Sequence, residues 1–228
     1  MPGRQSLKNL FISLPVKNKS GLNKSVILLP FIGALAFVSL YLIATFYYPG
    51  GSQHDPNARG FSWLHYYWCN LLNEQAINGL NNPGRPIAMA AMLVLCFSLA
   101  VFWYLFPIIT RLNKTLRLLM QIAGGLSMLT GFFLFTSQHD LLVNAASFFG
   151  LIATVITLIR MYQLRLTGLF RLGIFNVGLV LLNNILYYGN GLRTYLPVVQ
   201  KITFLFFLIW VCLCCIQLYK AQKKVQSA

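Results

Sequence analysis

The sequence predicts an all-α integral membrane protein built as a bundle of six transmembrane helices. Of its 228 residues, 57% are hydrophobic and 9% are charged, and the mean hydropathy is +0.67. A soluble domain carries about a quarter charged residues, so this composition indicates a membrane protein. Six stretches reach the roughly 20 apolar residues that cross a hydrocarbon core of about 30 Å. A helix satisfies its own backbone hydrogen bonds, which a bilayer requires.

The six predicted spans follow one another with mostly short connections. They cover residues 26–48, 87–109, 118–136, 141–160, 172–188 and 197–218. The first run is longer than a signal-peptide core and is followed by aromatic residues and a turn, so we expect a retained span, kinked at Pro30. The only charge inside a span is Lys201, close enough to one end to reach the interface.

The basic residues predict the orientation of the chain. Fourteen of the 18 lysines and arginines lie in the N-terminal segment, the second and fourth connections and the C-terminal tail; the others are Arg59, Arg85, Arg193 and Lys201. Short basic loops stay cytoplasmic, so both termini are expected inside, in the cell (plasma or inner) membrane. We expect a basic cytoplasmic segment (1–25), a transmembrane domain (26–219, with an outer loop at 49–86) and a basic cytoplasmic tail (220–228).

The net charge of +15 is spread over short flanks of the apolar spans. This distribution is typical of topology signals and of attraction to anionic lipid headgroups, and it does not indicate a nucleic-acid site. Membrane lipids are therefore the expected partners, and the sequence indicates no protein partner. Cys69 is the only cysteine expected outside the membrane-embedded and cytoplasmic parts, which excludes an intrachain disulfide on the outer side.

The long outer loop contains a segment with helical periodicity. At about 100° per residue, Ser62, His65 and Cys69 share one stripe of residues 61–75, next to Glu74, whereas leucines and Trp68 lie opposite. This pattern predicts an amphipathic helix in the outer interface. A re-entrant or seventh span would have to bury Glu74 and two asparagines.

All acidic residues and all histidines fall on the predicted outer side, as His54–Asp55, His65, Glu74 and His139–Asp140. Asparagines and a serine on spans four and five extend this polar region into the membrane. Polar groups in lipid are costly and should face one another, so the sequence predicts a polar pocket open to the outside. Its predicted ligand-binding residues are Glu74, Asn144, Ser147, Asn183 and Asn184.

Three interpretations of this pocket remain open. The residues could be helix caps and interhelical hydrogen bonds, with Asp140 at the N-terminus of span four. They could bind a divalent metal such as zinc, through His54, Asp55, His65, His139 and Asp140, although no HExxH spacing is present. They could also perform metal-free acid–base chemistry, with His65, His139 and Asp140 as catalytic residues.

We rank the corresponding functions in that light. Binding of a lipid headgroup or a small ligand comes first, and a metal-dependent membrane hydrolase acting on lipids at the outer face is the alternative. A small transporter comes third, because such carriers place an ionisable group near the midplane, where this chain has only amides and hydroxyls.

Two short motifs carry a resemblance of layout. Asn78-Gly-Leu-Asn-Asn-Pro-Gly enters span two, and His139-Asp140-Leu-Leu-Val-Asn144 enters span four. With six spans, both ends inside and one long polar outer loop, the chain resembles small bacterial membrane families of unknown function and the DRAM-type six-span proteins. That resemblance implies no established activity and no functional residues. Alkaline-ceramidase-like hydrolases are also similar in combining His, Asp and Ser in a helical bundle, but they have seven spans and an HxxxH pair that this chain lacks.

Overall fold

The computed structural model describes residues 24–52, 55–136, 138–189 and 191–226. Six of its helices are long and apolar enough to cross a membrane, which confirms the predicted all-α, six-span bundle. They are α3 (Leu29–Phe46), α4 (Arg85–Ile109), α5 (Lys114–Phe132), α6 (His139–Gln163), α7 (Thr167–Tyr188) and α8 (Leu196–Gln226). The shorter elements are α2 (Lys24–Ile27) and the 3₁₀ helices η1 (Trp68–Leu72), η2 (Phe133–Phe135) and η3 (Arg193–Tyr195).

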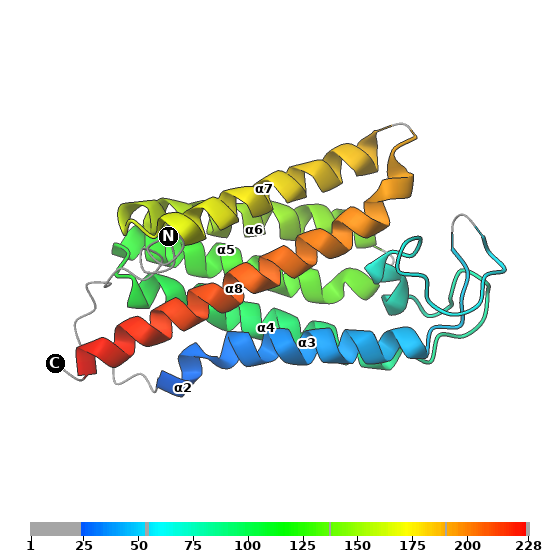
Figure 1. Ribbon diagram of the computed structural model, residues 1–228, viewed down its shortest axis with the longest axis horizontal. Helices are drawn as coiled ribbons and strands as arrows, with labels where there is room; N and C mark the ends of the chain where they lie inside the picture. The colour runs from blue at the N-terminus through cyan, green and yellow to red at the C-terminus, as the bar shows by residue number, and fades with distance from the viewer. Residues whose placement is uncertain (1–23, 53–54, 137, 190, 227–228) are drawn as a thin grey trace, which may run out of the picture.

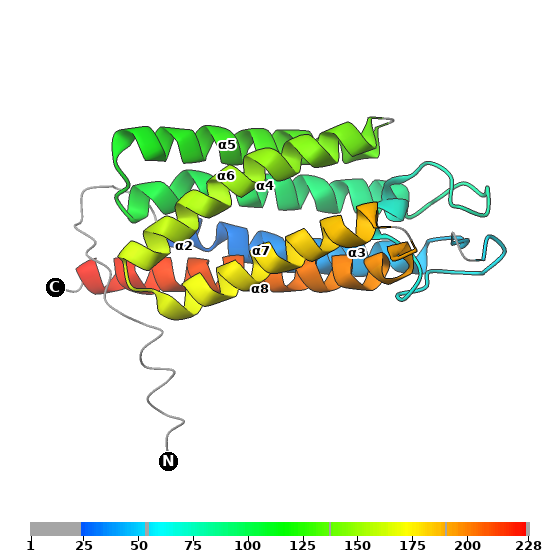
Figure 2. The ribbon, with the colours of Figure 1, turned by 90° about the horizontal axis from the view of Figure 1, so that it is seen from above.

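Consecutive helices pack in antiparallel pairs, and the last helix returns to the first. α3 packs on α4, α4 on α5, and α5 on α6, whereas α8 crosses the bundle diagonally and contacts α7, α4 and α3 (Figures 1 and 2). α6 and α7 contact each other over a smaller area. Figures 1 and 2 show that these two helices diverge towards the end of α7. This divergence later becomes important for the candidate site.

Close packing of small against large residues holds the interior together. α4 is the most buried span, with Phe102, Trp103 and Phe106 almost fully enclosed. A Cβ added at Gly124 of α5 would lie 2.4 Å from the Trp103 side chain, so only glycine permits this approach of α5 to α4. Such small-residue contacts drive helix association in membranes, where apolar side chains gain little by leaving lipid.

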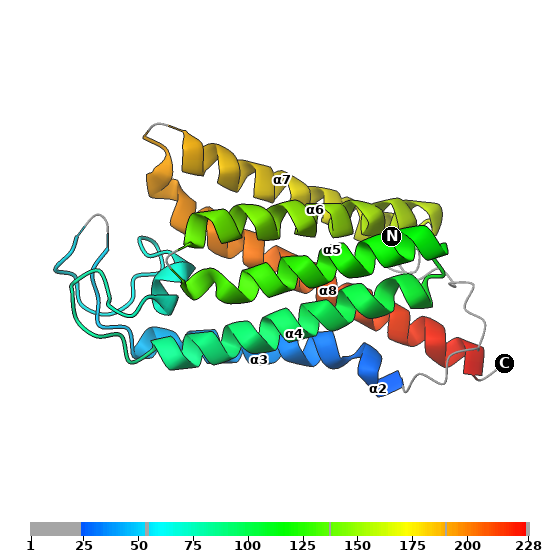
Figure 3. The same ribbon diagram turned by 180° about the vertical axis from the view of Figure 1, so that it is seen from behind.

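The connections separate into two chemically different ends of the bundle. One end, which we call the acidic end, holds residues 47–84 and the α5–α6 and α7–α8 connections, and carries Asp55, Glu74 and Asp140 (Figure 3). The opposite, basic end holds the α4–α5 and α6–α7 connections and the end of α8. There Arg160 of α6 donates from Nε to the Thr110 carbonyl oxygen (2.8 Å) and from Nη1 to Gln163 Oε1 (3.0 Å), so it ties α6 to the α4–α5 turn.

Two local expectations need correction. The predicted amphipathic helix at residues 61–75 is reduced to the five-residue η1, and the rest of residues 55–84 consists of turns and two isolated bridges, Gly50–Arg59 and Gln75–Asn81. The physical reason is that its aromatic residues turn into the bundle instead of lying on a flat interface. The kink expected at Pro30 is a break between α2 and α3, since α3 begins at Leu29 with the proline in its first turn.

Candidate functional site

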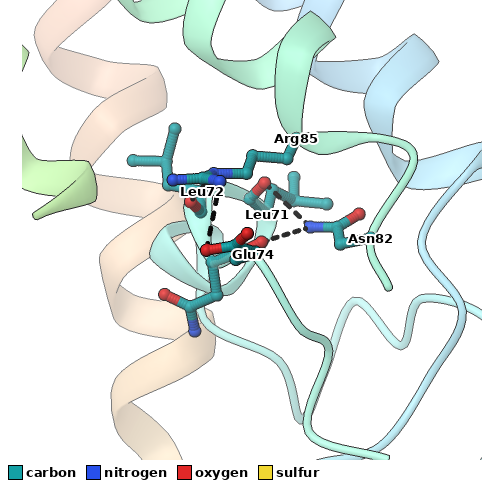
Figure 4. Close-up of polar contacts among 6 residues, drawn as sticks. Leu71, Leu72, Glu74, Asn82 and Arg85 are labelled. Carbon is teal, nitrogen blue, oxygen red and sulfur yellow. Dashed lines mark hydrogen bonds and ion pairs between the residues drawn. The ribbon is translucent and has the colours of Figure 1, made fainter. Parts of the chain in front are cut away.

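The long loop at the acidic end is fastened by one buried amide. Asn82 donates from Nδ2 to the carbonyl oxygens of Leu71 (3.0 Å) and Asn73 (3.1 Å), and its Oδ1 accepts a hydrogen bond from Gly84 N (3.0 Å). Arg85 at the start of α4 donates from Nε to the Leu72 carbonyl oxygen (Figure 4). Together these bonds hold η1 against the start of α4.

Figure 4 also shows the predicted ligand-binding residue Glu74 beside Arg85. Glu74 Oε2 lies 3.6 Å from Arg85 Nη1, and the glutamate side chain is 81% exposed. An exposed ion pair of this kind contributes at most about 1 kcal/mol. Glu74 thus belongs to the loop anchor.

A second anchor connects the loop to α8. Lys201 donates from Nζ to the carbonyl oxygens of Tyr66 (2.5 Å) and Pro197 (3.0 Å) and lies 5.8 Å from the centroid of the Phe61 ring. Its neighbour Gln200 accepts a hydrogen bond from Trp68 N (3.2 Å). The single charge inside a span therefore binds main-chain carbonyls of the loop.

Trp68 itself inserts between α3 and α8. Its ring centroid lies 5.0 Å from that of Tyr41, 5.6 Å from that of Phe204 and 5.8 Å from that of Phe37. The next residue, Cys69, is enclosed with it, and burial raises the pKa of its thiol to about 11. The loop thus closes the α3–α8 side of the acidic end with aromatic side chains.

The α6–α7 side of the bundle remains open. An apolar groove of about 450 Å³ runs between these helices in their basic half. Its lining residues are Val155, Leu158, Ile159 and Tyr162 from α6, and Phe170, Ile174 and Val177 from α7. The groove faces outward, where a membrane protein meets lipid.

Polar residues continue the same two helix faces towards the acidic end. On α6, the groove stripe of Val155, Leu158 and Tyr162 extends backwards at helical spacing through Leu151 to the polar residues Ser147, Asn144 and Asp140. On α7, the stripe of Phe170, Ile174 and Val177 extends through Leu181 to Asn184. The four polar residues are exposed. The diverging faces of α6 and α7, which we call the α6–α7 cleft, are therefore apolar in the basic half and polar in the acidic half.

Charged and aromatic groups border the acidic mouth of this cleft. The Tyr187 hydroxyl donates a hydrogen bond to the Asp140 carboxylate, and His139 Nδ1 lies 3.2 Å from Asp140 Oδ1. Arg193 of η3 donates from Nε to the Tyr187 carbonyl oxygen (2.9 Å), with its Cζ 5.2 Å from the Tyr187 ring centroid. The loop reaches this mouth through the Tyr67 hydroxyl, which donates to the Arg193 carbonyl oxygen (3.4 Å).

The other predicted site residues are dispersed. Asn183 faces α8, where its Nδ2 donates to Thr203 Oγ1 (2.5 Å) and to the Leu179 carbonyl oxygen, so it acts as an interhelical bond. His65 Nδ1 contacts Ser62 Oγ (3.0 Å). Asp55 Oδ1 accepts a hydrogen bond from Asn57 N (3.0 Å), which stabilises a local turn.

The predicted metal site is not assembled by the residues that the structure describes. Within those residues, no three His, Cys, Asp or Glu side chains are grouped closely enough to hold a metal ion. One of the five predicted ligands, His54, lies outside the described residues. A site that uses it stays a prediction.

Sequence reasoning missed Lys201, Tyr187 and Arg193. Lys201 carried a signal, because a charge inside a span usually has a specific partner. Tyr187 and Arg193 carried none, since tyrosine and arginine are ordinary interface residues at the end of a span.

Comparisons with protein-family models, with curated proteins and with solved structures gave no match to this chain. The resemblance to DRAM-type proteins therefore stays a prediction from layout. The fold and site define a multi-pass helical membrane protein with an amphiphilic cleft at its acidic end.

Proposed function

We propose that this membrane protein binds a lipid in the α6–α7 cleft, with the lipid's polar part at the acidic end. One observation carries the proposal: a single stripe of α6 changes from Asp140, Asn144 and Ser147 to Leu151 and an apolar groove. A lipid changes polarity along its length in the same order. Asp140 would lie at headgroup level, and Ser147, about 10 Å further along the helix at 1.5 Å per residue, at the level of the first acyl carbons.

The energetics favour an occupied cleft. Asn144, Ser147 and Asn184 are exposed on helix faces that hydrocarbon would otherwise cover. An amide or hydroxyl without a hydrogen-bond partner costs roughly 1–3 kcal/mol in an apolar environment. The ester or amide groups of a bound lipid would supply acceptors at this depth, whereas its acyl chain would cover the apolar groove.

The proposal includes an orientation. The acidic end faces outward and both termini are cytoplasmic, because the basic end collects the short basic connections. A lipid in the cleft would then come from the outer leaflet.

Lipid hydrolysis is the alternative that one contact favours. His139 and Asp140 touch each other at the mouth, where a headgroup would lie, and such a pair could act as a general base. Release of water-soluble headgroup from lipid by wild type, absent in His139→Ala, would support hydrolysis over simple binding.

Native mass spectrometry tests the binding function directly. The protein, purified in mild detergent, is expected to retain about one lipid per chain, and Leu151→Trp or Ile174→Trp should expel it by filling the cleft. The matched control is Leu93→Trp on α4, because Leu93 is 54% exposed and Leu151 is 48% exposed. Equal retention by all three variants, or no retained lipid in wild type, would contradict the proposal.

A further inference from the structure

We propose that the cleft selects a zwitterionic phospholipid, with the phosphate at Arg193 and the positively charged amine at Asp140. This inference rests on the proposed lipid-binding function and specifies its ligand. It starts from two opposite charges that border one mouth without pairing with each other. Among the described residues, the ion pairs are Arg85–Glu74 and His139–Asp140, so Arg193 and Asp140 form none with one another.

Tyr187 holds the two charges apart. Its ring lies under the Arg193 guanidinium, with 5.2 Å from Cζ to the ring centroid, and its hydroxyl bonds to Asp140. The Nε donor of Arg193 is fixed on the Tyr187 carbonyl oxygen. A cation and an anion are therefore placed at opposite ends of one rigid side chain, which separates them by more than an ion-pair distance.

Both charged groups face outward. The Asp140 side chain is 78% exposed, and Arg193 is exposed as well. The other two cations of the acidic end with assigned contacts are committed to the loop, since Arg85 binds Leu72 and Glu74, and Lys201 binds two carbonyls. Arg193 is thus the cation best placed for a ligand in the cleft.

A zwitterionic headgroup matches this arrangement. It carries a phosphate and, two carbons further, an ammonium or trimethylammonium group. Guanidinium is a preferred phosphate ligand, and a carboxylate beside aromatic rings is a preferred ligand for an organic cation. The exposed rings of Tyr188 and Tyr195 add aromatic surface to the same end of α7 and the start of α8.

Other lipid classes fit less well. An anionic phospholipid without an amine would leave Asp140 facing the phosphate without a cation between them. A diacylglycerol would leave both charges without a ligand. Charge complementarity therefore predicts selectivity for the headgroup, independent of the acyl chains that fill the groove.

Competition in mixed detergent–lipid micelles tests this selectivity. Equimolar phosphatidylethanolamine, phosphatidylcholine, phosphatidylglycerol and diacylglycerol with identical acyl chains are offered, and the lipids retained by the protein are quantified by native mass spectrometry. Wild type should favour both zwitterionic lipids over phosphatidylglycerol by roughly fivefold, which is about 1 kcal/mol. Asp140→Asn should remove that preference, and Arg193→Gln should remove the preference for phospholipid over diacylglycerol.

The controls use the same charges at the same end of the molecule. Asp55→Asn and Arg59→Gln remove exposed charges of the loop, and both variants should keep wild-type selectivity. Equal retention of all four lipids, with Leu151→Trp still expelling them, would overturn the headgroup assignment and leave lipid binding intact. Preference for phosphatidylglycerol would also overturn it. Absence of any retained lipid would overturn both proposals.

Discussion

Asn82 offers the sharpest test of how the long loop is held. Asn82→Ala removes two hydrogen bonds donated by Nδ2 and one accepted by Oδ1. It leaves the Leu71 and Asn73 carbonyls and the Gly84 amide without these partners in a buried place. At about 1 kcal/mol for each bond, the loop should lose about 3 kcal/mol of local stability. Asn82→Asp should lose a similar amount, because it turns two donors into an acceptor that faces two carbonyl oxygens.

Hydrogen–deuterium exchange measures this loss where it occurs. Amides of residues 66–84 should exchange roughly a hundredfold faster in Asn82→Ala, since each 1.4 kcal/mol is a factor of ten. Amides of α4 and α5 should not change. Asn81→Ala is the matched control, because Asn81 is adjacent in sequence and its side chain is exposed. Unchanged exchange at residues 66–84, or the same acceleration in Asn81→Ala, would refute the assigned role.

Three further outcomes are expected. A membrane-impermeant maleimide should leave Cys69 unlabelled at pH 7 and label it increasingly as pH approaches about 11, since burial raises its pKa and only the thiolate reacts; rapid labelling at pH 7 would show that η1 is not enclosed. Arg160→Gln should lower the melting temperature through lost bonds to the Thr110 carbonyl, an effect of roughly 1–3 kcal/mol, whereas Arg171→Gln on α7 should change it little. A glycosylation acceptor inserted near Asp55 should be modified in a eukaryotic host and one placed after Lys223 should not; the reverse pattern would invert the proposed orientation.

The architecture was largely predictable from hydropathy and charge. Each span is a long apolar run, and the basic connections alternate, so both the helices and the grouping of loops into two ends followed from composition alone. The loop was less predictable. Its aromatic residues have helical periodicity, but Trp68 gains more by packing among Tyr41, Phe37 and Phe204 than by continuing a helix. Such tertiary packing leaves no local signal.

The site was predictable only up to the identity of neighbouring helices. Helical spacing placed Asp140, Asn144 and Ser147 on one face, but it could not say which helix that face meets. Asn183 and Asn184 show the limit clearly, because adjacent residues point about 100° apart on a helix. Asn183 meets Thr203 of α8, whereas Asn184 lies on the stripe that borders the cleft.

The return of α8 to the beginning of the chain has a consequence for biosynthesis. Residues 49–84 emerge between the first two spans, yet Tyr66 and Trp68 bind Lys201 and Gln200 of the last one. The loop therefore cannot complete its structure until the final helix has left the ribosome and inserted. A chain truncated after α7 would keep five spans but present a loosened loop to quality control and proteases. Protease sensitivity of residues 49–84 would thus report whether the C-terminal helix has been inserted.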